Sequence, residues 1–118
     1  MSIALLPVIF PLLTCYTGSA IINNGTDETS GNIIINGGTI ESIVSGNSIS
    51  SGTAINLNKG NVEVNNATIT TKGNAIFVNN VNSEVIINSG TIGINGYGVY
   101  NNVECKNIYI NSGELGKI

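Results

Sequence analysis

The sequence predicts an all-β solenoid, a fold in which short strands stack through repeated turns of the chain. Triplets of apolar, variable and apolar residues, each followed by asparagine, recur at spacings of 29, 23 and 23 residues, over 33–35, 62–64, 85–87 and 108–110. Self-similarity at such a period is typical of units that bury their apolar faces only against neighbouring units. β-Branched residues, frequent Asn and Gly, and the lack of apolar residues at helical spacing indicate strands rather than helices.

Each predicted coil begins with a glycine and contains three short strands. The coils start near residues 18, 52, 73 and 96, and a small residue and then an apolar one follow each glycine, as in Gly73-Asn74-Ala75-Ile76. Further columns, meaning residues at one position of successive coils, contain Thr39, Thr68, Thr91 and Glu114, and then Ile40, Ile69, Ile92 and Leu115. The repeats therefore define one domain over 18–118, preceded by a segment over 1–17.

The asparagine after each triplet is predicted to form a ladder through the stack. The four positions are Asn36, Asn65, Asn88 and Asn111. Asparagine tolerates left-handed backbone dihedrals, and its carboxamide can both donate to and accept from the same residue one coil away.

The repeat units, IIINGGTI, VEVNNATI, VIINSGTI and IYINSGEL, resemble the right-handed parallel β-helix repeats of bacterial and archaeal adhesin-like surface proteins. The resemblance covers most of the chain and implies a right-handed parallel β-helix of about four coils, as a fragment of a longer solenoid. It further implies a non-catalytic stalk or glycan-contacting surface, outside the cell or on its surface. Further coils or self-association at the open ends, and glycans or a neighbouring cell surface, are the implied partners.

The N-terminal segment, MSIALLPVIFPLL, is the most apolar part of the chain and allows two interpretations. It has the length of a signal-peptide core, and Gly18-Ser19-Ala20 offers a cleavage site, but no basic residue precedes it. Pro7 and Pro11 and its short length argue against a transmembrane helix. The alternative is an end cap over the first coil.

Composition excludes several classes of function. Charged residues are 9% of the chain, the net charge is −3 and histidine is absent, so no basic stripe is available for nucleic acid or an anionic membrane. Cys15 and Cys105 are expected several coils apart, beyond disulfide reach, as small core or turn residues. The Asp27-Glu28 pair is interpreted as a solvated turn rather than a calcium site. We expect no metal and no cofactor.

Catalysis is not predicted. A polysaccharide hydrolase needs two converging carboxylates, whereas Glu63, Glu84 and Glu114 occupy different columns. A catalytic triad, a P-loop and a dinucleotide fingerprint are all missing from the sequence. A polysaccharide-degrading enzyme and a purely structural solenoid remain as alternatives. Ice binding is disfavoured because Glu114 interrupts the threonine column.

Two tyrosines are the candidate ligand contacts. Tyr97 and Tyr109 fall at outward-facing positions, where an aromatic ring can stack on a sugar. Tyr100 shares a column with Phe77 and is predicted to stack on it instead. The additional segment 41–51, which lengthens the first interval and is expected to hold another short strand, is a second candidate for specificity.

Overall fold

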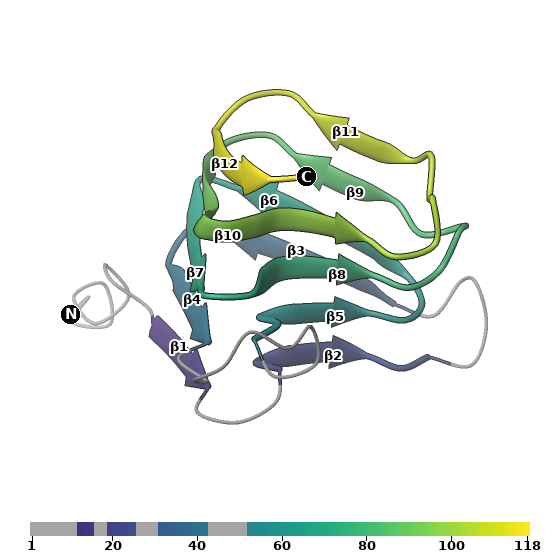
Figure 1. Cartoon of the computed structure of the whole chain (residues 1–118), viewed down its shortest axis with the longest axis horizontal. Coiled ribbons are helices and arrows are strands. Elements are labelled where there is room, and N and C mark those ends of the chain that lie inside the picture. The colour runs from purple at the N-terminus through teal and green to yellow at the C-terminus, as the bar shows by residue number, and fades with distance from the viewer. Residues whose placement is uncertain (1–11, 16–18, 26–30, 43–51) are drawn as a thin grey trace, which may run out of the picture.

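The computed structural model describes residues 12–15, 19–25, 31–42 and 52–118, and these form an all-β structure (Figure 1). The described residues contain no helix, and accordingly none long and apolar enough to cross a membrane. The strands are β1 (Leu12–Cys15), β2 (Ile21–Asn23), β3 (Asn32–Asn36), β4 (Thr39–Ser42), β5 (Ile55–Leu57), β6 (Asn61–Asn65), β7 (Ala67–Thr71), β8 (Asn74–Val78), β9 (Val85–Ile87), β10 (Gly90–Asn101), β11 (Ile108–Ile110) and β12 (Glu114–Lys117).

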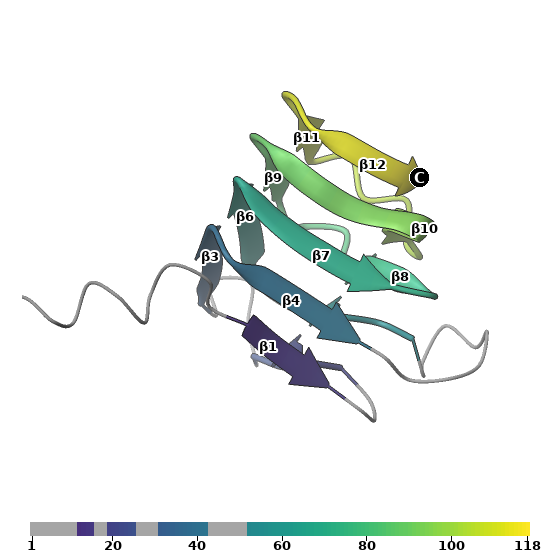
Figure 2. The same cartoon turned by 90° about the vertical axis from the view of Figure 1, so that its left-hand side faces the viewer.

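The strands build two parallel sheets. One has four strands in the order β11-β9-β6-β3. The other has eight strands in the order β1-β4-β7-β10-β8-β5-β2, with β12 also paired to β10. The long β10 joins the two halves of this sheet, because its first residues pair with β7 and its last residues pair with β8. Figure 2 shows the four-stranded sheet and the strands β4, β7 and β10 of the other sheet as separate walls of the molecule.

The register of the strands matches the columns that the sequence predicts. Ile35 pairs with Val64, Val64 with Ile87, and Ile87 with Ile110. The threonine column pairs in the same way from Thr39 to Glu114, as does the column of Ile21, Ile55, Ile76 and Val99. A one-residue slip would turn every apolar side chain outward, so the alternating pattern specifies this register.

The core lies between the walls and is tightest in the middle repeats. Val64, Val85 and Ile87 are fully buried, as are Ile76 and Ile92 in the other sheet. At the last repeat the same column is less protected, because Ile110 has only one neighbouring strand and remains 39% exposed. Burial therefore depends on neighbouring repeats, which is the behaviour expected of stacked units.

Close backbone approach requires the glycines that open the third and fourth repeats. A Cβ added to Gly73 would lie 2.8 Å from the carbonyl oxygen of Gly52, and one added to Gly96 would overlap the carbonyl oxygen of Gly73. The Tyr97 N–H meanwhile donates to the Gly73 carbonyl at 2.8 Å. A larger residue at Gly73 or Gly96 would push adjacent repeats apart.

Four residues that we assigned to the N-terminal segment extend the stack. Strand β1 pairs in parallel with β4, and Leu13 takes the place of Ile40 in its column. The ladder position before this strand holds Ile9 instead of asparagine, so the repeat pattern does not identify it. The interpretations of 1–11 as cap or signal remnant, of 26–30 as a solvated turn and of 43–51 as a further strand lie outside the described residues.

Candidate functional site

The four predicted asparagines form a hydrogen-bonded ladder along one margin of the four-stranded sheet. Each Nδ2 donates to Oδ1 one repeat earlier: Asn65 to Asn36 at 2.9 Å, Asn88 to Asn65 at 2.8 Å, and Asn111 to Asn88 at 2.7 Å. Every bond points toward the N-terminal end of the stack.

The backbone explanation for these asparagines is wrong. Among the described non-glycine residues, only Asn66 and Glu104 have positive φ, at 54° and 56°. The left-handed turn therefore falls one residue after the ladder, at Asn66 in the second repeat and at Gly37 (φ 106°) in the first. Asparagine is needed at the ladder positions for its carboxamide, not for its backbone freedom.

A second ladder, which was not predicted from the sequence, runs along the other sheet. Asn58 donates to Asn24, Asn79 to Asn58 at 3.1 Å, and Asn102 to Asn79 at 3.0 Å. All four residues stand six positions after the opening glycine of their repeat. That regularity was a readable signal, hidden because neighbouring positions in the same turns are also asparagine.

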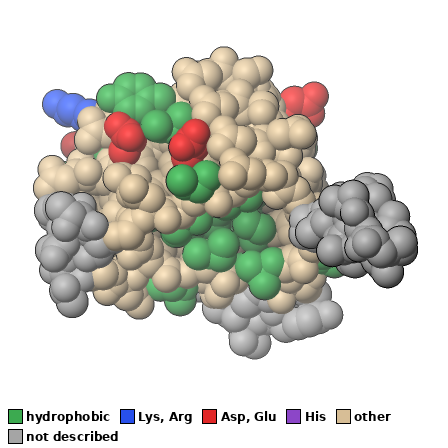
Figure 3. All heavy atoms as spheres, turned by 180° about the vertical axis from the view of Figure 1, so that it is seen from behind, with side chains coloured by type: hydrophobic (Ala, Val, Ile, Leu, Met, Phe, Trp, Pro, Cys, Tyr) green, Lys and Arg blue, Asp and Glu red, His purple; other side chains and the backbone are tan. Residues whose placement is uncertain are grey.

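The outer face of the four-stranded sheet is mixed in character. Its central column consists of Ile34, Glu63, Ile86 and Tyr109, and Ile34 and Tyr109 are 58% and 48% exposed. Figure 3 shows this face, with hydrophobic side chains in its centre and acidic side chains beside them. Glu63 Oε1 accepts hydrogen bonds from Asn88 at 3.2 Å and from Asn65 at 3.4 Å.

Glu63 and Glu84 line one hollow on this face, although they occupy different columns of the repeat. The hollow is about 90 Å³, and Asn32, Asn61 and Ile86 also line it. Ligand pockets usually exceed about 300 Å³, so this hollow is too small to enclose a sugar ring. The described residues contain no group of three or more His, Cys, Asp or Glu side chains that could hold a metal ion.

An aromatic cluster lies on β8 and β10. The Phe77 and Tyr100 rings stack with centroids 5.6 Å apart and planes 11° apart, as predicted. Tyr97 meets Tyr100 edge-on at 5.2 Å and 82°. Both geometries are favourable for ring quadrupoles. Tyr97, which is 36% exposed, is thus an outward ring held in edge contact with Tyr100.

Beside this cluster lies an open groove of about 620 Å³. Its lining comes from three segments far apart in the sequence: 72–74, 94–97 and 116–117. The volume falls within the range of about 300–1,000 Å³ typical of small-molecule sites. Sequence columns placed Tyr97 on the surface, but they gave no sign that these three segments enclose a groove.

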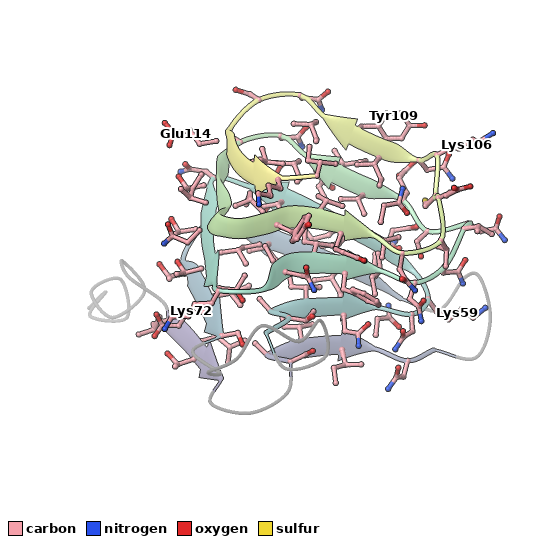
Figure 4. The ribbon with its side chains drawn as sticks, viewed as in Figure 1. Lys59, Lys72, Lys106, Tyr109 and Glu114 are labelled. Carbon is pink, nitrogen blue, oxygen red and sulfur yellow. The ribbon has the colours of Figure 1, made fainter. Side chains whose placement is uncertain are left out.

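The two predicted ligand contacts do not converge. Tyr97 belongs to β10 of the eight-stranded sheet and lines the groove, whereas Tyr109 belongs to β11 of the four-stranded sheet. Figure 4 shows Tyr109 near Lys106, away from Lys72. One small ligand therefore cannot contact both rings.

The threonine face is interrupted. The column of Thr39, Thr68 and Thr91 ends at Glu114, and Glu41 pairs between Thr14 and Thr70 in the next outward column. Glu41 Oε1 accepts a 2.8 Å hydrogen bond from Thr14 Oγ1. These carboxylates break the uniform threonine array that an ice-binding surface would need.

Cys105 is buried, as expected for a core or turn residue. It is 5% exposed and its thiol donates to the Ser83 carbonyl at 3.0 Å. Asn101 clamps the same residue, accepting from its N–H at 2.8 Å and donating to its carbonyl at 2.7 Å. Cys105 is a free thiol.

No protein-family model, curated protein or solved structure matches this chain. Functional inference therefore rests on its own residues.

Proposed function

We propose that this chain is a segment of a right-handed parallel β-helix in an extracellular, adhesin-like surface protein, where it acts without catalysis as a stalk and glycan-contacting surface. The groove beside Tyr97 carries the proposal. It combines adequate volume, an outward aromatic ring and an exposed polar neighbour, Asn95. Sugar sites combine an aromatic platform with a few positioned polar groups in this way.

The scaffold suits such a role because its surface chemistry is amide-rich rather than ionic. Charged residues are only 9% of the chain, and two asparagine ladders line its walls. Carboxamides both donate and accept, as sugar hydroxyls do, without the desolvation penalty of a buried charge. A stalk would also benefit, since ladders brace the repeats against sliding.

Partners at the ends of the stack are part of the proposal. Strands β11 and β3 are the outer strands of the four-stranded sheet. Outer strands present unpaired N–H and C=O groups that can accept another strand. We propose that further β-helix coils or a second copy of the chain pair there.

Glycan binding is tested by applying the intact chain to an array of neutral, sialylated, sulfated and uronate-containing oligosaccharides. Any bound glycan is then titrated against Tyr97→Ala and Tyr109→Ala, two exposed tyrosines on different sheets. Loss of a stacking ring should weaken binding about tenfold for Tyr97→Ala, corresponding to ~1.4 kcal/mol. Tyr109→Ala should bind as the parent chain does.

Two results would replace this proposal. Release of shortened sugars from an acidic polysaccharide would support the alternative, a fragment of a polysaccharide-degrading enzyme, and Glu63→Gln should then abolish the release. Absence of binding to every glycan would favour a purely structural solenoid, in which Tyr97→Ala changes only stability.

A further inference from the structure

The groove beside Tyr97 concentrates positive charge in an acidic protein. The chain has four Lys and Arg residues against seven Asp and Glu residues. Lys72 and Lys117 both line the groove, and no acidic residue in the described part of the chain lines it. Figure 4 places Lys72 on the opposite side of the molecule from Lys59 and Lys106. The groove is therefore a local cationic site on a chain of net charge −3.

Both ammonium groups are available to a ligand. Across the part of the chain that the structure describes, no ion pair joins Lys72 or Lys117 to a carboxylate. Lys117 Nζ lies 5.9 Å from the centroid of the Tyr97 ring. This distance is at the outer limit of about 6 Å for a cation–π contact, so the contact is weak and does not neutralise the ammonium charge.

The floor and walls of the groove supply neutral polar contacts. Gly73, Gly96 and Gly116 line it and bring backbone rather than side chains to its surface. Asn95 is exposed at its edge, where its carboxamide can reach a sugar hydroxyl. A ligand that carries both hydroxyls and a negative group would match these features better than a neutral sugar or a bare anion.

We infer that the groove binds an oligosaccharide through a sugar residue carrying a carboxylate or a sulfate, with the sugar against Tyr97, the anionic group beside the Lys117 ammonium, and Lys72 adding positive charge elsewhere on the groove lining. This inference rests on the proposed glycan-contacting function and specifies its ligand class. Both lysines are exposed, so the contact between Lys117 and the anion is a solvent-screened ion pair of modest strength. Selectivity for the charged sugar should accordingly fall as salt is added.

The test compares three ligands that share one core: lactose, 3′-sulfolactose and 3′-sialyllactose. Their dissociation constants for the full chain are measured by isothermal titration calorimetry at low and high salt. We expect at least one charged ligand to bind about three- to fivefold tighter than lactose at low salt, as one exposed ion pair allows, and the difference to shrink at high salt. Comparing sulfate with carboxylate identifies which anion fits.

Charge variants locate the site. Lys117→Gln should weaken binding of the charged ligand about three- to fivefold, Lys72→Gln should weaken it by a smaller factor, and both should leave lactose binding unchanged. Lys106→Gln removes the same charge on the other side of the molecule and should leave both unchanged. Far-UV circular dichroism confirms that each variant is folded.

The possible failures are distinguishable. Equal binding of lactose and its charged derivatives would overturn the inference about anionic sugars and leave glycan binding intact. Charge-dependent binding that Lys106→Gln weakens as much as Lys117→Gln would overturn the assignment to the groove. If neither these ligands nor any oligosaccharide of the array binds, both the inference and the proposed function fail.

Discussion

Asn88 Nδ2 donates a 2.8 Å hydrogen bond to Oδ1 of Asn65, the equivalent residue one repeat earlier. The same amide also approaches Glu63 Oε1 at 3.2 Å, and Oδ1 of Asn88 accepts from Asn111 at 2.7 Å. One side chain thus links three consecutive repeats. Such a residue should contribute more to stability than an asparagine at the end of its ladder.

We predict that Asn88→Ala lowers the free energy of unfolding by about 1–2 kcal/mol, because it removes two donor contacts and leaves the Asn111 amide without its acceptor. Asn111→Ala is the matched control. It removes one bond at an exposed position and should cost less than about 1 kcal/mol. Urea denaturation of both variants measures the difference. Equal losses would mean that the bonds do not act as a ladder.

The second ladder gives a parallel prediction. Asn79 accepts from Asn102 and donates to Asn58, so Asn79→Ala should lower the free energy of unfolding by about 1 kcal/mol. Asn82→Ala changes an exposed asparagine three residues away and should be neutral within about 0.5 kcal/mol. Thermal unfolding followed by circular dichroism compares them, and an unchanged melting temperature for Asn79→Ala would argue against the second ladder.

Periodicity predicted the parallel register because each column repeats the same residue type at the same place. Ile87 and Asn88, for example, could be assigned to core and ladder from the triplet pattern alone. Strand β1 was harder to predict, because its sequence LLTC shares only the apolar Leu13 with the column of Ile40. A single strand cannot show a repeat in the sequence, so periodicity could not predict that β1 pairs with β4.

The groove was not predictable for a different physical reason. Lys72, Tyr97 and Lys117 belong to three segments that are far apart in the sequence. The curvature of the chain in these segments decides whether the surface between them is concave or convex. Column assignment fixes which residues are neighbours but not the concavity between them. Likewise, Glu63 and Glu84 occupy different columns and still share a hollow, because residues on adjacent strands also meet diagonally.

The two faces of β9 allow a sharp test of the core. Ile87 is fully buried, whereas its neighbour Ile86 points outward beside Glu63 and is only partly buried. Ile87→Asp places a carboxylate in the core without a partner and should cost several kcal/mol, enough to unfold the chain. Ile86→Asp should keep the far-UV β signal and lose much less stability. A folded Ile87→Asp chain with the parent melting temperature would refute the assignment of faces.

A close backbone approach between two repeats yields the last prediction. Gly96 has no unusual φ, so replacing it by alanine carries no backbone strain, but the added Cβ would overlap the Gly73 carbonyl oxygen. That oxygen also accepts the Tyr97 N–H, so the two repeats cannot separate without lengthening a 2.8 Å hydrogen bond.

We therefore expect Gly96→Ala to lower the free energy of unfolding by about 1–3 kcal/mol, the usual cost of inserting one carbon into a packed site. Asn95→Ala, at the exposed adjacent position, serves as control and should stay within about 0.5 kcal/mol of the parent. Because Gly96 also lines the groove, the variant should weaken glycan binding as well, through a shifted Tyr97. Parent-like stability of Gly96→Ala, measured by urea denaturation, would show that adjacent repeats do not lie this close at their opening glycines.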